Sequence, residues 1–218
     1  MMPRVLPHDD PETPSAVNAA LETGQTIVFP TDTIYGIGGN PWDVRSLDRV
    51  RALKNRPADQ PFALLLPTRA SIERYAALDA RLRPLIGRLL PGPFTLLVPA
   101  AEGAPSSSVQ GGKIGVRVPD HPFFWRTLAR LDRPMFGTSV NRHGEPPIVD
   151  IEAIIDRFAA VDLIVTGPTG MHASTILDLA VVPPRAIRGD LPRELRSVLD
   201  EEQDGNPADR EERPQNGA

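Results

Sequence analysis

Three basic residues in this chain could bind an anion. Lys54 and Arg56 are separated by one residue. A guanidinium grips a phosphate or carboxylate through two N–H groups, and an ammonium acts as a point charge. Arg117 lies between Val116 and Val118 in an apolar segment, where a buried guanidinium needs an anionic partner. These residue types indicate a ligand that carries phosphate or carboxylate groups.

Each of these cations also has a purely structural explanation. Lys54 and Arg56 fall at the expected C-terminus of a helix, where cations offset the helix dipole and Pro57 stops the helix. Arg117 could be held by a structural ion pair. From the residues alone, both interpretations stay open.

Hydroxyl and amide side chains follow two predicted strands. The loop at 31–35 begins where an apolar strand ends, and it presents Thr33 together with further hydroxyls and one carboxylate. Ser139 and Asn141 share parity, so both project to one side while Val140 points away. An ordinary turn before a helix explains either cluster equally well.

Two further polar residues lie at the ends of predicted β segments. Ser174 is the first residue of a later strand, and Arg188 lies at the end of the final β segment. Open α/β sheets place ligands beyond the ends of their strands, so these clusters predict one pocket for a small ligand with anionic groups. The Gly-rich segment 36–41 does not satisfy the dinucleotide-binding pattern, and no Walker A sequence is present.

Short apolar segments that alternate with helix-like segments must position these residues, and this alternation is typical of an α/β domain. Several predicted strands follow one another without a helix between them, which favours a mixed parallel and antiparallel sheet. The predicted strands are residues 26–30, 62–67, 94–99, 114–119, 134–139, 162–167 and 174–180. The predicted helices are residues 15–23, 43–53, 68–77, 79–90, 122–131, 150–159 and 190–199.

Length and composition favour one domain in a reducing compartment. The chain has 218 residues, of which 40% are hydrophobic, enough for one substantial core. A net charge of −4 disfavours a protein that mainly coats nucleic acid, and the absence of Cys excludes thiolate chemistry and disulfides. The four His show no close metal spacing, so we assign no metal ligand to the protein.

The two ends of the chain differ from its middle. Residues 1–14 are rich in Pro and acids, and residues 200–218 are almost free of apolar side chains. We therefore expect a flexible N-terminal segment and a disordered acidic tail around one domain at 15–199. No apolar stretch approaches the roughly 20 residues that span a bilayer, and no signal-peptide core is present. We expect a soluble cytoplasmic protein with no membrane partner.

Read in order, the segments that carry these residues resemble successive motifs of the YrdC-like family, the threonylcarbamoyl-AMP synthases. The segments are FPTDTIYGIG, KNRPADQPFALLL, PGPFTLLVPA, GVRVPDHP, TSVNRHGEPP, STILDL and AIRGD. The resemblance runs from about residue 15 to 195 and includes the family's Lys-x-Arg and Ser-x-Asn signatures. It implies a twisted mixed sheet around a large cavity. It also implies synthesis of L-threonylcarbamoyladenylate and pyrophosphate from L-threonine, bicarbonate and ATP with Mg²⁺, for threonylcarbamoyladenosine in tRNA.

The resemblance also implies roles for individual residues and partners. Arg117 would pair with the threonine carboxylate, and Thr33 and Ser174 would belong to the same subsite. Lys54 and Arg56 would be catalytic, stabilising negative charge together with Mg²⁺ brought by ATP. A tRNA-modifying transferase complex would consume the product, and weak binding of tRNA is a further expectation. The ATP subsite would comprise Lys54, Arg56, Gln60, Ser139, Asn141 and Arg188.

Three positions depart from the family pattern. Residues 64–66 are all Leu where some relatives carry His, so we assign no ligand there. His143 replaces a small hydroxyl residue, and Pro147 stands where some relatives have a polar nucleotide contact. The expected N-carboxy intermediate decomposes in water, so a segment must cover the pocket; we expect residues 103–112 to be that lid.

Two alternative functions fit parts of the same pattern. A module that binds RNA and acts in ribosome maturation is disfavoured by the acidic charge and by an aromatic content of 5%. A carbamoyl-transfer enzyme would use a similar domain, but such enzymes usually carry further fused domains, for which we expect no room in 218 residues.

Overall fold

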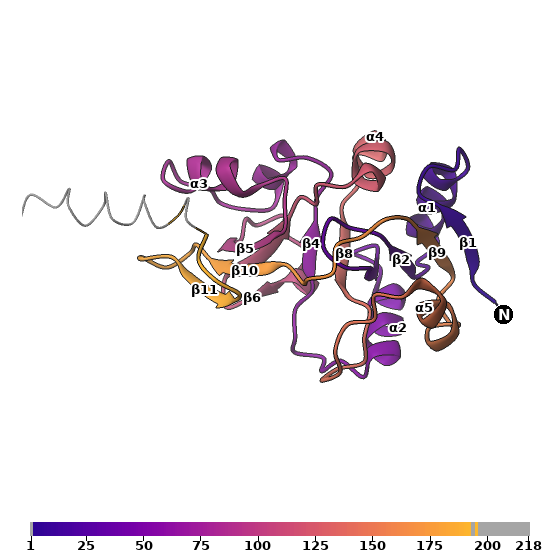
Figure 1. Ribbon diagram of the computed structural model, residues 1–218. Coiled ribbons are helices and arrows are strands. Elements are labelled where there is room, and N and C mark those ends of the chain that lie inside the picture. The colour runs from indigo at the N-terminus through magenta and orange to yellow at the C-terminus, as the bar shows by residue number, and fades with distance from the viewer. Residues whose placement is uncertain (1, 193–194, 196–218) are drawn as a thin grey trace, which may run out of the picture.

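One mixed sheet organises the molecule, which confirms the predicted α/β class (Figure 1). The computed structural model describes residues 2–192 and 195, so the predicted acidic tail and most of the predicted helix at 190–199 lie outside the described residues. The strands are β1 (Arg4–Pro7), β2 (Ile27–Phe29), β3 (Gly36–Gly39), β4 (Ala63–Leu65), β5 (Phe94–Pro99), β6 (Val109–Gln110), β7 (Lys113–Arg117), β8 (Met135–Ser139), β9 (Leu163–Thr166), β10 (Thr175–Asp178) and β11 (Arg185–Arg188). Their order across the sheet is β1-β9-β2-β3-β8-β4-β7-β5-β10-β11, with β6 paired to β7.

Short helices connect these strands. The α-helices are α1 (Thr13–Glu22), α2 (Val44–Lys54), α3 (Leu82–Leu89), α4 (Ala129–Leu131) and α5 (Ile151–Arg157). Asp43 is the N-cap of α2, because its carboxylate accepts a hydrogen bond from the Arg45 backbone N–H. The tighter turns are the 3-10 helices η1 (Ala70–Arg74) and η2 (Ser106–Ser108) and the π-helical turn η3 (Phe124–Leu128). No helix in the described part of the chain is both long and apolar enough to span a membrane.

Alternation along β5 and β7 separates an apolar face of the sheet from a polar one. Leu96, Val98, Ile114 and Val116 are buried in a core that also contains the apolar face of α3. The residues between them point to the opposite face because side chains alternate along a strand. Arg117 is one of these, so its predicted orientation away from its valine neighbours is confirmed.

The opposite face of the sheet is covered by helices over only part of its width. Helix α1 and the turn η3 pack on this face of β2 and β9 through a cluster that includes Val17, Phe29 and Phe124, whereas α2 and α5 pack on the other face of β2, β3 and β8. On β5, β7 and β10, the face that carries α1 elsewhere instead lines a cavity. The cavity therefore has strands as its floor.

The flexible segment expected at residues 1–14 is corrected by the structure, which pairs β1 in parallel with β9. The Arg4 backbone N–H donates to the Asp162 carbonyl at 3.0 Å, and the His8 N–H donates to the Thr166 carbonyl at 2.7 Å. Most β1 side chains are exposed, so the strand is held mainly by its backbone. Composition gives no sign of this kind of edge pairing.

Most of the Gly-rich segment 36–41 is a strand that was not among the predicted ones, since residues 36–39 form β3 between β2 and β8. A Cβ on Gly38 would overlap the backbone carbonyl oxygen of Phe136. The glycine therefore permits an approach of the two backbones that no other residue allows. This pairing brings the loop after β2 next to the end of β8, where two of the predicted polar clusters lie.

Candidate active site

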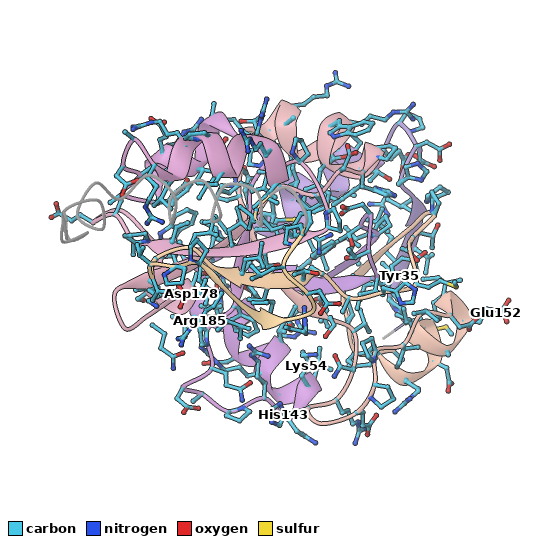
Figure 2. The ribbon with its side chains drawn as sticks, turned by 60° about the vertical axis from the view of Figure 1, so that its left-hand side comes forward. Tyr35, Lys54, His143, Glu152, Asp178 and Arg185 are labelled. Atoms are coloured by element: carbon cyan, nitrogen blue, oxygen red, sulfur yellow. The ribbon has the colours of Figure 1, made fainter. Side chains whose placement is uncertain are left out.

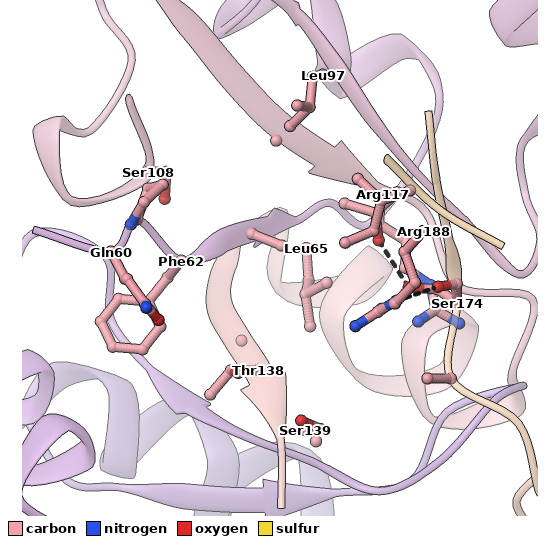
Figure 3. Close-up of a pocket in the computed structure, with 18 of the residues that line it drawn as sticks. Gln60, Phe62, Leu65, Leu97, Ser108, Arg117, Thr138, Ser139, Ser174 and Arg188 are labelled. Carbon is pink, nitrogen blue, oxygen red and sulfur yellow. Dashed lines mark hydrogen bonds between the residues drawn. The ribbon is translucent and has the colours of Figure 1, made fainter. Parts of the chain in front are cut away.

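A cavity of about 610 Å³ opens on the polar face of the sheet (Figure 3). This volume lies in the usual range for small-molecule sites. Gly115 of β7 and Gly137 of β8 contribute to its floor, where they leave room for a ligand. A Cβ on Gly137 would lie only 2.6 Å from Cδ1 of Leu65, which also lines the cavity, so the glycine leaves room for this side chain. The walls come from the loop after β2, the segment before β4, the β6–β7 hairpin and β10–β11.

Within the described part of the chain, four cations and no carboxylate line this cavity. Each cation is held from behind by a polar group of the protein, which fixes its direction. A ligand with negative charge is therefore favoured throughout the cavity. The four are Arg56, Lys113, Arg117 and Arg188.

The guanidinium of Arg117 is held by Asp32 on the loop after β2. Its Nη2 donates to Asp32 Oδ1 at 2.5 Å, and the two side chains are only 8% and 13% exposed. Burial lowers the pKa of Arg117, and the adjacent carboxylate opposes that shift. Arg117 Nε is buried and has no hydrogen-bond partner among the described residues, so the guanidinium keeps donors for a ligand. The structural ion pair considered as an alternative is present, and it leaves the cavity side of Arg117 accessible to a ligand.

Arg56 lies just beyond the end of α2, and its guanidinium lies 4.9 Å from the centroid of the Phe62 ring. Its Nη2 donates to the Pro61 carbonyl at 2.7 Å, whereas its buried Nε has no partner among the described residues. Burial, and to a lesser degree the Arg51 cation, lower the pKa of Arg56. Gln60 lines the cavity beside it. This cation is thus oriented by a carbonyl and an aromatic face rather than by a carboxylate.

Arg188 is tied to Ser174 across the β10–β11 pair. Its Nε donates to the Ser174 carbonyl at 3.0 Å and its Nη2 donates to Ser174 Oγ at 3.1 Å. The same hydroxyl lies 3.0 Å from Thr95 Oγ1 of β5. Desolvation lowers the pKa of Arg188. The hydroxyls of two strands and one guanidinium therefore form a single polar cluster.

Polar residues lie at both ends of the cavity, with Thr138 and Ser139 between them (Figure 3). Arg117, Arg188 and Ser174 lie together at one end, and Gln60 and Ser108 lie at the other. Small and apolar side chains line the floor between them. The cavity therefore suits an elongated ligand that carries polar or anionic groups at both ends.

Hydroxyl side chains line the side of the cavity formed by β8 and by the loop between β2 and β3. Thr33 Oγ1 lies 2.9 Å from Thr31 Oγ1, which donates to the Ile34 carbonyl. Ser139 Oγ donates to Asn141 Oδ1 at 2.6 Å, which confirms that these two side chains share a side. Asn141 itself does not line the cavity, so its contact with Ser139 is what connects it to the site.

Lys54 does not line the cavity, although the sequence analysis placed it at the phosphates. Its side chain is buried, and its Nζ donates to the carbonyls of Ser139 and Asn141 and to Asn141 Oδ1 at 2.5, 2.7 and 3.0 Å. Figure 2 shows Lys54 near His143, whose backbone N–H donates to the Lys54 carbonyl. Lys54 therefore fixes the segment after β8 from behind, and Arg56 is the member of the pair that faces the cavity.

The environment of Lys54 predicts a pH-dependent stability. Burial, with a smaller contribution from Arg56, lowers the pKa of Lys54 from 10.5 to about 7. Between these values the unfolded chain binds a proton that the folded chain lacks, so the free energy of unfolding rises with pH. We expect wild type to gain more stability than Lys54→Met from pH 7 to 10, by at most about 1.4 kcal/mol per pH unit. Urea unfolding at several pH values measures this, and parallel curves would show that folded Lys54 stays charged throughout.

The structure brings most of the predicted site residues together and adds others. Lys113 and Gln110 of the β6–β7 hairpin and Ser108 of η2 also line the cavity, and none of the three was a predicted site residue. Lys113 has the same parity as Arg117 on β7, which was the available signal. Residues of the expected lid, 103–112, line the cavity, and the movement of this segment stays a prediction. The predicted residues that line the cavity are Thr33, Arg56, Gln60, Arg117, Ser139, Ser174 and Arg188.

Comparison with known proteins places this architecture in a family. A family model named for Sua5, YciO and YrdC, and described as telomere recombination, matches residues 19–189. A threonylcarbamoyl-AMP synthase of Pyrococcus abyssi is 30% identical over 190 residues, which are 83% of this chain and 55% of that protein. One of Chromohalobacter salexigens is 33% identical over 165 residues, 74% of this chain and 89% of that protein.

A solved structure shows the same fold. The crystal structure of P. abyssi Sua5 complexed with L-threonine matches with a TM-score of 0.78 at 27% identity, over 91% of this chain and 61% of that one. This chain thus spans little more than half the length of its archaeal relative. Because the family model covers residues 19–189, the chain belongs to the Sua5/YciO/YrdC family.

Proposed function

We propose that this chain is a threonylcarbamoyl-AMP synthase, which joins L-threonine, bicarbonate and ATP into threonylcarbamoyl-AMP and pyrophosphate. The observation that carries the proposal is one cavity with Arg117 and Arg188 at one end, Arg56 against Phe62 at the other, and no lining carboxylate among the described residues. Such a cavity suits an amino-acid carboxylate at one end and a polyphosphate at the other. The names of the relatives support the same activity.

The amino acid would occupy the end with Arg117. The guanidinium would pair with the threonine carboxylate, and Asp32 would keep it in place. Ser174 and Thr33 would offer hydroxyls to the amino acid's polar groups. Valine would bind much more weakly than threonine, because its missing hydroxyl leaves a buried polar group of the site unpaired. Serine lacks only one methyl group, and this difference changes the binding free energy by about 1–3 kcal/mol.

ATP would occupy the rest of the cavity, with its phosphates toward Arg56 and Gln60 and with Ser139 and Arg188 as further contacts. Lys54 and Asn141 would act indirectly, by holding Ser139 in place. No group of three His, Asp or Glu side chains in the described ranges is arranged to hold a metal ion. Mg²⁺ would therefore enter on the phosphates of ATP, where it neutralises part of their charge.

The chemistry requires positioning rather than a protein nucleophile. The threonine amine and bicarbonate form an N-carboxy species with loss of water, and its carboxylate oxygen bonds to the α-phosphorus of ATP as the bond to pyrophosphate breaks. Arg56 would stabilise the charge that develops on the phosphates. Fixing both reactants in one cavity supplies most of the advantage of proximity.

Water must be kept from the N-carboxy species. The segment at 103–112 is suited to this because Ser108 and Gln110 line the cavity while Ser107 donates to the Pro41 carbonyl at 2.9 Å. Ser108 Oγ is buried and has no partner among the described residues, so a bound ligand would satisfy it. The finished adenylate would pass to a transferase that modifies tRNA.

The test is pyrophosphate release by the purified chain with ATP, Mg²⁺ and bicarbonate. We expect release only when L-threonine is present, and much less with L-valine. Release that depends on carbamoyl phosphate instead of threonine and bicarbonate would favour a carbamoyl-transfer enzyme. Tight RNA binding without any release would favour an RNA-binding module.

A further inference from the structure

Residues 167–174, which we call the crossing segment, connect β9 to β10 (Figure 1). Six other strands lie between β9 and β10 in the sheet order, so a flat sheet would place the two strands about 34 Å apart. Eight residues span at most about 30 Å when fully extended. The sheet therefore curves, and the crossing segment takes a direct path across the molecule. Its last two residues, Ala173 and Ser174, line the cavity.

The start of the crossing segment is held by Tyr35, the residue before β3. The Tyr35 hydroxyl donates to the Gly167 carbonyl at 2.6 Å and accepts a hydrogen bond from the Gly167 backbone N–H at 3.2 Å. Tyr35 is buried and also lines the cavity. Because the hydroxyl has a single proton and gives it to the Gly167 carbonyl, Tyr35 supports the crossing segment and has no donor left for a ligand.

His121, which lies just before η3, holds the next residue of the crossing segment. Its Nδ1 accepts a hydrogen bond from the Phe123 backbone N–H at 3.1 Å, so the proton of the neutral ring is on Nε2, which donates to the Pro168 carbonyl at 2.9 Å. Burial lowers the pKa of His121, which favours this neutral form. His121 does not line the cavity, so it can affect a ligand there only through its neighbours.

The middle and the end of the crossing segment contact the supports of two cavity cations. A Cβ on Gly170 would lie 2.7 Å from the Thr33 carbonyl oxygen and 2.8 Å from that of Asp32. The two backbones are therefore in direct contact, beside the carboxylate that holds Arg117. Ser174, the last residue of the crossing segment, accepts two hydrogen bonds from the other guanidinium at this end of the cavity. The position of the crossing segment thus bears on both cations.

We propose that Tyr35 and His121 are positioning residues for the amino-acid end of the cavity, and that they act through the crossing segment. They fix the backbone of Gly167 and Pro168, and the segment extends this fixed position to Ser174. Without either contact, the residues at this end would occupy a wider range of positions, and a bound amino acid would have to order them at a cost in affinity. This inference rests on the proposed function, because it assigns the ligand at this end as L-threonine.

The test measures binding of L-threonine and of MgATP, each alone, by calorimetry. We expect His121→Leu and Tyr35→Phe each to weaken L-threonine binding about 10-fold, the effect of losing one buried hydrogen-bonding partner. MgATP binding should change less than about 3-fold, because its phosphates are assigned to the other end of the cavity. In pyrophosphate release, the KM for threonine should rise while kcat stays within about 3-fold.

Thr13→Val is the matched control. The buried Thr13 hydroxyl donates to the Pro7 carbonyl at 2.7 Å, so this variant also removes one side-chain donor from a backbone carbonyl. Thr13 does not line the cavity. We expect Thr13→Val to lower the urea midpoint of unfolding by an amount similar to that in Tyr35→Phe and to leave L-threonine binding within about 2-fold. A general loss of stability would instead weaken binding equally in the two variants.

A conservative variant and a second measurement complete the test. His121→Gln keeps an N–H donor for the Pro168 carbonyl, so it should bind L-threonine within about 3-fold of wild type. Hydrogen exchange at the Gly167 amide, followed by NMR, should be about 10-fold faster in His121→Leu, although His121 does not itself contact this amide.

Unchanged L-threonine binding in either His121→Leu or Tyr35→Phe would overturn the role of that residue. Equal weakening of L-threonine and MgATP binding, or unchanged exchange at Gly167 in His121→Leu, would overturn the action through the crossing segment. A wild type that binds no L-threonine would contradict the proposed function, and exchange at Gly167 would still decide whether His121 holds the crossing segment.

Discussion

Replacing Arg56 by alanine is expected to lower kcat/KM for threonine-dependent pyrophosphate release by about 100- to 1000-fold, the loss caused by removing one transition-state charge donor. Arg56 faces the cavity, and its Nε is buried without a partner among the described residues. Its Nη2 is oriented by the Pro61 carbonyl at 2.7 Å, so the guanidinium needs little reorganisation when phosphate arrives. Steady-state kinetics measures the loss, and circular dichroism checks that the variant is folded.

Arg51→Ala is the matched control for this variant. The Arg51 guanidinium also lies over the Phe62 ring, at 5.2 Å against 4.9 Å for Arg56. It pairs with Asp48 and does not line the cavity, so its removal takes away a cation–π contact and no cavity donor. We expect a loss of less than about 5-fold. Equal losses in the two variants would show that packing on Phe62, rather than phosphate binding, explains the effect, and normal turnover in Arg56→Ala would remove its role at the phosphates.

The elements that could be predicted from the sequence are those with a strong local signal. β5 contains a continuous apolar segment, β7 places apolar residues at alternate positions, and Asp43 marks the start of α2. β1 and β3 lack such a signal. β1 is a four-residue strand with mostly exposed side chains, and β3 is GIGG, whose pairing depends on a backbone approach that only glycine allows. Both strands form because of partners far away in the chain, which local patterns do not reveal.

In the candidate site, too, the residues with a local sequence signal could be predicted, and those that depend on distant partners could not. Strand parity correctly predicted the directions of Arg117 and Ser139, because a strand leaves a side chain only two faces. Parity says nothing about Lys54, which ends α2 and could point into the cavity or behind it. Its direction is decided by the Ser139 and Asn141 carbonyls, 85 and 87 residues later in the chain. The ion pair between Lys113 and Asp178 likewise depends on strand order and not on local sequence.

Replacing Arg117 by methionine is expected to lower the free energy of unfolding by about 3–5 kcal/mol, because it leaves the Asp32 carboxylate in a nearly buried position without its partner. Urea unfolding at pH 7 measures the change. Arg74→Met is the control, since Arg74 makes two hydrogen bonds to Asp132 at 2.8 and 2.9 Å with side chains 50% and 61% exposed. Loss of this solvated pair should cost less than about 1 kcal/mol.

Combining Arg117→Met with Asp32→Asn separates the structural role of the ion pair from ligand binding. The double variant has no unpaired buried charge, so most of the lost stability should return. Its KM for threonine should stay raised by about 100-fold or more, since the charge-assisted contacts to the amino-acid carboxylate are still absent. If the double variant regained threonine affinity together with stability, Arg117 would serve only as the partner of Asp32, and the amino acid would have to bind elsewhere in the cavity.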